Sequence, residues 1–115
     1  MTNSLDLVKD IVQIIDDKKA QEISVLDLDK VSLVADYFVI CTGNSSTQTK
    51  AISDYILKEL EQKPLRIEGY KGANWILLDF GSVVVHIFLE ETREFYDLER
   101  LWGDARTVEK STIGI

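Results

Sequence analysis

The sequence predicts one domain of the α/β (α+β) class, in which a mixed, mostly five-stranded sheet is flanked by helices. Apolar residues recur at helical spacing in three segments of the chain. Five short runs rich in β-branched and aromatic residues have the character of strands. The order is helix, two strands, helix, three strands, helix, which indicates strands of mixed direction with helices on at least one face. A chain of 115 residues is long enough to bury its own core.

The N-terminal part of the chain predicts a helix and then two strands. Asn3 with Asp6 is a start signal for the helix. The stretch EISVLDLD, residues 22–29, alternates as a strand does, and DYFVICTG, residues 36–43, is apolar on both faces, as suits a central strand. The apolar stripe of the helix consists of Leu5, Val8, Ile11, Val12 and Ile15.

The middle of the chain predicts a second helix and a short strand. Ser45 followed by Gln48 is a capping-box signature, so the helix is expected to begin here and to end before Pro64. LRIEGY, residues 65–70, follows as the short strand.

The last predicted helix lies near the C-terminus. Thr92 is a candidate cap, and Gly103 is expected to stop the helix. From Asp104 to Ile115 there is no periodicity, so we expect a flexible tail after a single domain that spans residues 1–103. The apolar stripe predicted for this helix consists of Phe95, Leu98, Leu101 and Trp102.

Charge and cysteine content narrow the range of partners and compartments. The net charge is −7, which argues against direct sequence-specific binding to nucleic acid and favours a basic protein partner. Cys41 is the single cysteine, so no internal disulfide can form, which fits a reducing compartment. The N-terminus does not resemble a signal peptide, and no apolar run reaches the ~20 residues of a membrane helix. We therefore expect a cytoplasmic protein without a membrane partner.

The stretch WILLDFGSVVVHIF, residues 75–88, predicts a hairpin with two different faces. Gly81 and Ser82 suit a two-residue type II′ loop, which would place Trp75 opposite Phe88. The face expected to join the core carries Ile76, Leu78, Phe80, Val83, Val85 and Ile87. The other, mixed face carries Trp75, Leu77, Asp79, Val84, His86 and Phe88.

Three interpretations of the mixed face remain open. A helix covers it, with Asp79 and His86 at the edge of the covered area. Alternatively it is a protein-docking patch, because tryptophan is enriched in interface hot spots. In the third interpretation Asp79 and His86, on diagonal positions, form an acid–base pair.

Other candidate sites in the sequence are weaker. CTGNSST, residues 41–47, runs from a strand into a helix start and could bind phosphate, although Ser45 or Asn44 could simply cap the helix. Asp27 and Asp29 could hold a divalent ion as a paired carboxylate, but no third acid at a known spacing supports this. One histidine and one cysteine do not make a zinc site. We therefore predict no catalytic residues, no metal and no cofactor.

Three blocks of sequence resemble the ribosomal silencing factor family, also called Iojap-related proteins. They are DYFVICTGNSSTQTKAI, EGYKGANWILLDFGSVVVHIF and REFYDLERLWGDA, in this order. Together they cover most of residues 36–105, and the second block is the most specific.

The resemblance implies a fold similar to the nucleotidyltransferase superfamily without its paired catalytic acids. It implies a binding protein that docks on ribosomal protein L-fourteen of the large subunit, blocks subunit joining and lowers translation when nutrients are scarce. Trp75, Leu77 and Asp79 match the docking strand of the family, and Tyr70 and Lys71 match the segment leading into it.

With Phe88 and His86 from the mixed face, these five residues form the predicted partner-binding set. The resemblance also makes a homodimer off the ribosome plausible. The alternative is a nucleotidyltransferase-like nucleotide-binding protein or enzyme that uses the turn at residues 43–46 with Asp27, Asp79 or His86.

Overall fold

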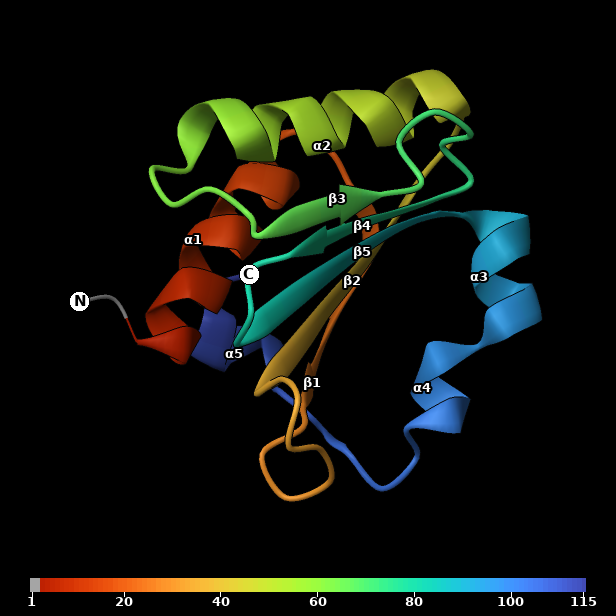
Figure 1. Ribbon diagram of the computed structural model, residues 1–115. Helices are drawn as coiled ribbons and strands as arrows, with labels where there is room; N and C mark the ends of the chain where they lie inside the picture. The colour runs from red at the N-terminus through yellow and green to blue at the C-terminus, as the bar shows by residue number, and fades with distance from the viewer. Residues whose placement is uncertain (1–2) are drawn as a thin grey trace.

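The computed structural model describes residues 3–115, which form a mixed sheet with helices on both faces (Figure 1). The order of the strands is β3-β4-β5-β2-β1-β6, and β2 and β5 pair in parallel while the other neighbours are antiparallel. The predicted fold class is therefore confirmed, with a sixth strand that the sequence did not predict. The strands are β1 (Gln21–Asp27), β2 (Tyr37–Gly43), β3 (Arg66–Glu68), β4 (Trp75–Asp79), β5 (Val83–Leu89) and β6 (Arg106–Thr107).

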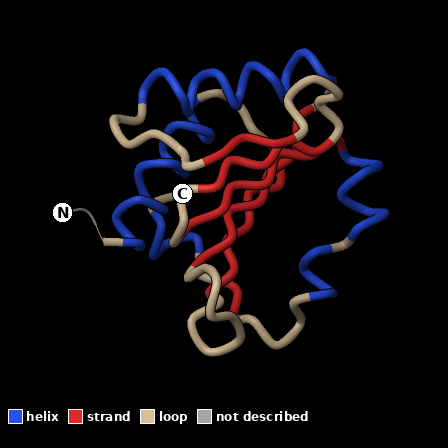
Figure 2. The backbone as a smooth tube through the Cα atoms, viewed as in Figure 1, coloured by secondary structure: helices blue, strands red, loops and turns tan. Residues whose placement is uncertain are grey.

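The helices are divided between the two faces of the sheet. In Figure 2, α1 and α2 lie together on one side of the strands, and α3 and α4 follow one another on the other side. None of the helices within residues 3–115 has the length and apolar character needed to cross a membrane. The helices are α1 (Ser4–Asp17), α2 (Ser46–Glu59), α3 (Glu90–Tyr96), α4 (Leu98–Leu101) and α5 (Lys110–Ile113).

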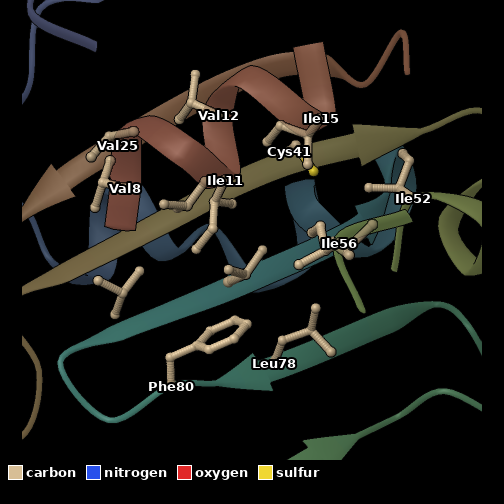
Figure 3. Close-up of a cluster of buried hydrophobic side chains, with 14 of the residues drawn as sticks. Val8, Ile11, Val12, Ile15, Val25, Cys41, Ile52, Ile56, Leu78 and Phe80 are labelled. Carbon is tan, nitrogen blue, oxygen red and sulfur yellow. The ribbon is translucent and has the colours of Figure 1, made fainter. Parts of the chain in front are cut away.

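The main core lies between the sheet and the layer of α1 and α2. Ile11 and Ile15 of α1 and Ile56 of α2 are fully buried against Leu78 of β4 and other strand residues (Figure 3). Burying side chains of this size contributes roughly 1.5–3 kcal/mol each relative to exposure. This packing holds the β4–β5 hairpin on a rigid support.

Two of the three predicted helix starts are confirmed by their caps. The Asn3 side chain accepts a hydrogen bond from the backbone N–H of Asp6, and Ser45 accepts one from that of Gln48. The side chain of Gln48 returns to the N–H of Asn44, one residue before the position that a standard capping box uses. The turn after β2 is thus occupied with capping α2.

The prediction for the last helix was wrong in two respects. Thr92 lies inside α3, and the helix is interrupted at Asp97, which has a left-handed backbone with φ of 46° and caps α4 with its side chain. The interruption changes the helical phase, so Leu98 is buried while Phe95 and Leu101 remain exposed. The predicted continuous apolar stripe does not form.

The expectation of a flexible tail after Gly103 is also corrected. Thr107 of β6 pairs with Leu26 of β1, and the N–H of Val108 donates to the carbonyl of Val25. Val108 and Ile113 are buried in the main core. The segment is too short to show periodicity, but the free edge of β1 supplies the hydrogen-bond partners that order it. Residues 1–2 of the predicted domain lie outside the described range.

Candidate protein-docking site

The β4–β5 hairpin has the predicted register. Trp75 pairs with Phe88 and Asp79 with Val84, around a loop in which Gly81 has φ of 89°. The carboxylate of Asp79 accepts a hydrogen bond from the N–H of Gly81 at 2.8 Å, which helps to hold the turn. All six residues of the predicted core face lie in the main core: Ile76, Leu78, Phe80, Val83, Val85 and Ile87.

The mixed face is divided into a covered half and an open half. On β5, His86 and Phe88 are buried, and this half belongs to a second cluster that includes Leu98 of α4. On β4, Trp75, Leu77 and Asp79 are half-buried, because α3 packs on β5 and β2 and reaches β4 only where Tyr96 meets Trp75. We call Trp75, Leu77 and Asp79 the open strip. The interpretation in which a helix covers the face therefore holds for the β5 half, and the docking interpretation stays a prediction for the β4 half.

Trp75 is held in place from one side only. Its indole N–H donates to Nδ1 of His86 at 3.0 Å, and its ring packs against Phe88 and Tyr96, with centroids 4.9 Å and 4.7 Å away. These contacts fix the orientation of the ring and leave part of it exposed to solvent. An aromatic side chain that is already oriented loses little conformational entropy when a partner binds it.

The loop before Trp75 is tightly built. Gly69 has φ of 78°, and a Cβ there would lie 2.0 Å from the carbonyl oxygen of Trp75, so only glycine fits. The carbonyl of Ala73 accepts a hydrogen bond from the buried hydroxyl of Thr49 on α2 at 2.7 Å. The main-core helix layer thus sets the position at which β4 and the open strip begin.

His86 supports Trp75 rather than acting as a base. Burial lowers the pKa of His86 from 6.5 to about 4, so the ring is neutral at pH 7. Because Nδ1 accepts from the indole of Trp75, the proton resides on Nε2, which is buried and has no hydrogen-bond partner among residues 3–115. The ring also packs edge-on against Phe38, with centroids 4.5 Å apart.

Asp79 and His86 do not form the acid–base pair considered from the sequence. The carboxylate of Asp79 instead accepts a hydrogen bond from Nε of Arg66 on the neighbouring edge strand β3, at 3.1 Å. Arg66 also lies 3.8 Å from Glu68. The open strip is therefore bordered by an exposed charged edge that β3 provides, which the sequence analysis did not include.

Tyr70 and Lys71 lie apart from the open strip. The hydroxyl of Tyr70 donates to Asp54 of α2 at 3.1 Å, and Lys50 of α2 lies over its ring at 5.6 Å. Tyr70 is therefore directed towards the helix layer on the opposite face of the sheet. Lys71 is exposed in the same loop. Of the seven predicted residues, three form the open strip on β4. His86 and Phe88 lie beside it on β5, and Tyr70 and Lys71 lie on the loop before β4.

A groove of about 450 Å³ next to Trp75 contains residues that the sequence analysis missed. Phe95 and Tyr96 of α3 line it, together with Glu91 and Thr92 of the same helix and with Gly69, Gly72, Ala73 and Asn74 of the loop before β4. The sequence placed Phe95 in a buried stripe, so it gave no reason to expect this residue beside Trp75. Only the interruption of the helix at Asp97 leaves Phe95 exposed.

The other candidate sites are occupied by structural contacts. Asp27 accepts hydrogen bonds from the N–H of Asp29 and from Arg106. Within residues 3–115, no group of three or more His, Cys, Asp or Glu side chains is arranged to hold a metal ion. Cys41 is buried, and burial raises the pKa of its thiol to about 12, so it is not a nucleophile at neutral pH.

Comparison with known proteins identifies the family of the chain. The family model "Ribosomal silencing factor during starvation" matches residues 1–114. The ribosomal silencing factor RsfS of Halalkalibacterium halodurans is 45% identical over 107 residues, covering 90% of this chain and 92% of that protein. RsfS of Bacillus subtilis is 43% identical over 106 residues, with 90% of each chain covered.

A solved structure agrees with the sequence relatives. A crystal structure of a protein from Bacillus halodurans superposes with a TM-score of 0.78 at 41% identity, over 90% of this chain and 97% of that one. The match to the family model along almost the whole chain and the likeness of the fold lead to one assignment: this chain belongs to the ribosomal silencing factor family.

Proposed function

We propose that this protein is a ribosomal silencing factor that binds the large ribosomal subunit through ribosomal protein L-fourteen. The bound protein occupies the surface that the small subunit needs, and so it represses translation in the cytoplasm when nutrients are limiting, as in stationary phase. Steric exclusion of this kind requires no catalytic residue, metal or cofactor. The proposal rests on the family and on the open strip.

The observation that carries the proposal is that Trp75, Leu77 and Asp79 lie side by side on one face of β4 and are each only partly buried. A preoriented aromatic ring, an aliphatic neighbour and a carboxylate are the parts of a typical hot spot for a basic protein partner. Phe88 and His86 are buried, so they contribute indirectly, by holding the ring of Trp75 in place. Tyr70 and Lys71 stay predicted contacts on the loop before β4, where Tyr70 is directed towards α2.

The test is co-sedimentation with purified large subunits and with assembled ribosomes. The wild type is expected to pellet with large subunits and not with assembled ribosomes. Trp75→Ala is expected to weaken binding by ~2 kcal/mol or more, and Leu77→Ala by about 1 kcal/mol, as truncations at a hot spot and beside it do. The matched control is Leu33→Ala, which removes an equally large and fully exposed side chain from a distant loop.

Because Trp75 also packs inside the protein, each variant is checked by circular dichroism and thermal unfolding. Leu77→Ala is the more decisive variant, since it leaves intact the internal hydrogen bond and ring contacts that Trp75→Ala removes. A folded Leu77→Ala and a folded Trp75→Ala that both bind as tightly as Leu33→Ala would refute this interface.

We also propose that the open strip supports a homodimer off the ribosome. A second copy and the large subunit would then compete for Trp75 and Leu77. Analytical ultracentrifugation over a range of concentrations is expected to show dimers that dissociate when large subunits are added. A dimer that remains intact on the subunit would show that the two surfaces are distinct.

A further inference from the structure

The groove beside Trp75 is an aromatic surface that the protein itself leaves open. Phe95 is 81% exposed and Tyr96 is 49% exposed, although both are large aromatic residues. The rings of Phe95 and Tyr96 meet edge to face with centroids 5.0 Å apart, and Tyr96 continues to Trp75. Three aromatic rings, from the start of β4 and the end of α3, thus line one side of the groove.

The charge of the groove is negative. Glu91 lines it, and within residues 3–115 this carboxylate has no ion-pair partner. Arg93 is the one basic residue of α3, and it is directed elsewhere: it donates to the carbonyl of Glu22, to the hydroxyl of Thr42 and to Glu99. The groove therefore combines exposed π faces with an unneutralised carboxylate.

These properties select the kind of group that fits. A purely apolar occupant would bury the carboxylate of Glu91 without compensation, which is costly. A phosphate or carboxylate group would be repelled by Glu91 and by a chain of net charge −7. A guanidinium group meets both demands, because it stacks flat on aromatic faces and pairs with a carboxylate through two parallel hydrogen bonds.

We propose that this groove binds an arginine side chain of the basic ribosomal protein on which the factor docks. The inference rests on the proposed function and deepens it, because Trp75 belongs both to the open strip and to the groove. The arginine would stack on Phe95 and Tyr96 and pair with Glu91, while the neighbouring surface of the partner covers Leu77.

The first test uses a small probe and does not involve the ribosome. N-acetyl-arginine amide is titrated into the protein while the indole N–H signals of its two tryptophans are followed by NMR, with Trp75→Phe assigning the signal of Trp75. The arginine amide is expected to shift the signal of Trp75 in a saturable way, and the neutral probe N-acetyl-glutamine amide is not. Glu91→Gln is expected to weaken this binding about fivefold, in the range of one exposed ion pair.

The second test measures binding to large subunits. Glu91→Gln and Phe95→Ala are each expected to weaken binding about tenfold, as loss of a charged or aromatic partner at an interface does. The matched control is Glu94→Gln, an exposed residue on the same helix that lines a different depression with Arg93. This control is expected to bind within about twofold of the wild type.

The outcomes separate this inference from the proposed function. If the wild type binds large subunits and Glu91→Gln and Phe95→Ala bind equally well, the arginine site is refuted and the silencing role stands. If the arginine amide binds the groove but the wild type does not bind large subunits, the silencing role and the ribosomal source of the arginine are both refuted, and only the affinity of the groove for a guanidinium group stands. Phe95→Ala that abolishes dimers and leaves subunit binding unchanged would assign the groove to a second copy of the chain, and would overturn the inference.

Discussion

At the scale of single residues, the central feature is the hydrogen bond between Trp75 and His86. It explains why a histidine lies in an otherwise apolar hairpin: its unprotonated Nδ1 accepts the indole N–H that a buried aliphatic side chain could not satisfy. Protonation of His86 would place a second donor opposite the indole N–H and would also charge a buried ring. The orientation of Trp75 therefore depends on His86 remaining neutral.

This dependence predicts how stability varies with pH. Because the pKa of His86 is about 4 in the folded protein and 6.5 when unfolded, the unfolded state binds more protons between these values. The stabilisation is complete above pH 6.5 and is lost as the pH falls towards 4, by about 3 kcal/mol in all at 1.36 kcal/mol per pKa unit. Urea unfolding of the wild type at intervals from pH 7.5 to pH 4 measures this loss.

The control is His86→Gln, which keeps a polar side chain and removes the titrating group. Its free energy of unfolding is expected to be lower than that of the wild type at pH 7.5 and to fall less steeply below pH 6.5. The carboxylates titrate in both proteins, so the difference between the two slopes isolates the histidine. Equal slopes would mean that His86 is not buried as a neutral ring.

At the scale of elements, the sequence predicted those parts whose pattern is local. The hairpin register follows from Gly81, which adopts a positive φ, and from the strict alternation of residues on either side of it. The cap at Ser45 is equally local and was predicted correctly, and so were four of the five stripe residues on α1, where Leu7 is buried in place of Leu5. For the same reason, the face of the β4–β5 hairpin that joins the core, opposite the open strip, could be assigned from the sequence alone.

The elements that were missed depend on contacts between distant residues. The turn at Asp97 is held by Arg93, which joins α3 to β1, β2 and Glu99, and no spacing in the sequence reveals that arrangement. The missed groove is a consequence of the same turn. The exposure of β4 likewise depends on where α3 and α4 end, so the division of the mixed face into open and covered halves could not be predicted.

The ordered C-terminal segment gives a prediction at the scale of elements. Ile113 of α5 is buried in the main core, where α5 lies against α1. Ile113→Ala is expected to lower the free energy of unfolding by about 2 kcal/mol or more, as deletion of buried methyl groups does. Chemical denaturation measures the change. The matched control is Thr112→Ala, an exposed neighbour that is expected to change stability by less than about 0.5 kcal/mol. An Ile113→Ala variant as stable as this control would mean that residues 104–115 form a flexible tail after all.

At the scale of the whole molecule, we expect the overall charge to act on a partner at a distance, and the open strip and the groove to act at contact. The open strip and the groove lie on the sheet face and edge that α1 and α2 do not cover. The net charge of −7 belongs to the entire surface and includes acidic residues far from the strip, such as Asp10 and Asp16 of α1. A negative surface disfavours contact with RNA phosphates and attracts basic proteins, so under the proposed function the global charge would favour the basic partner before the strip makes contact.

This division predicts separate effects on association and dissociation rates. Neutralising three exposed acids remote from the strip, Asp10→Asn, Asp16→Asn and Glu61→Gln together, changes the net charge from −7 to −4 without touching the interface. At low salt, association with the isolated basic protein L-fourteen is expected to slow about two- to fivefold, because long-range steering weakens, while the dissociation rate stays the same. At high salt, where the Debye length is only a few ångströms, the two proteins should associate equally fast. Stopped-flow tryptophan fluorescence measures both rates.

A faster dissociation would mean that these distant acids contact the partner, and an unchanged association rate at low salt would mean that the acidic surface plays no part in finding it.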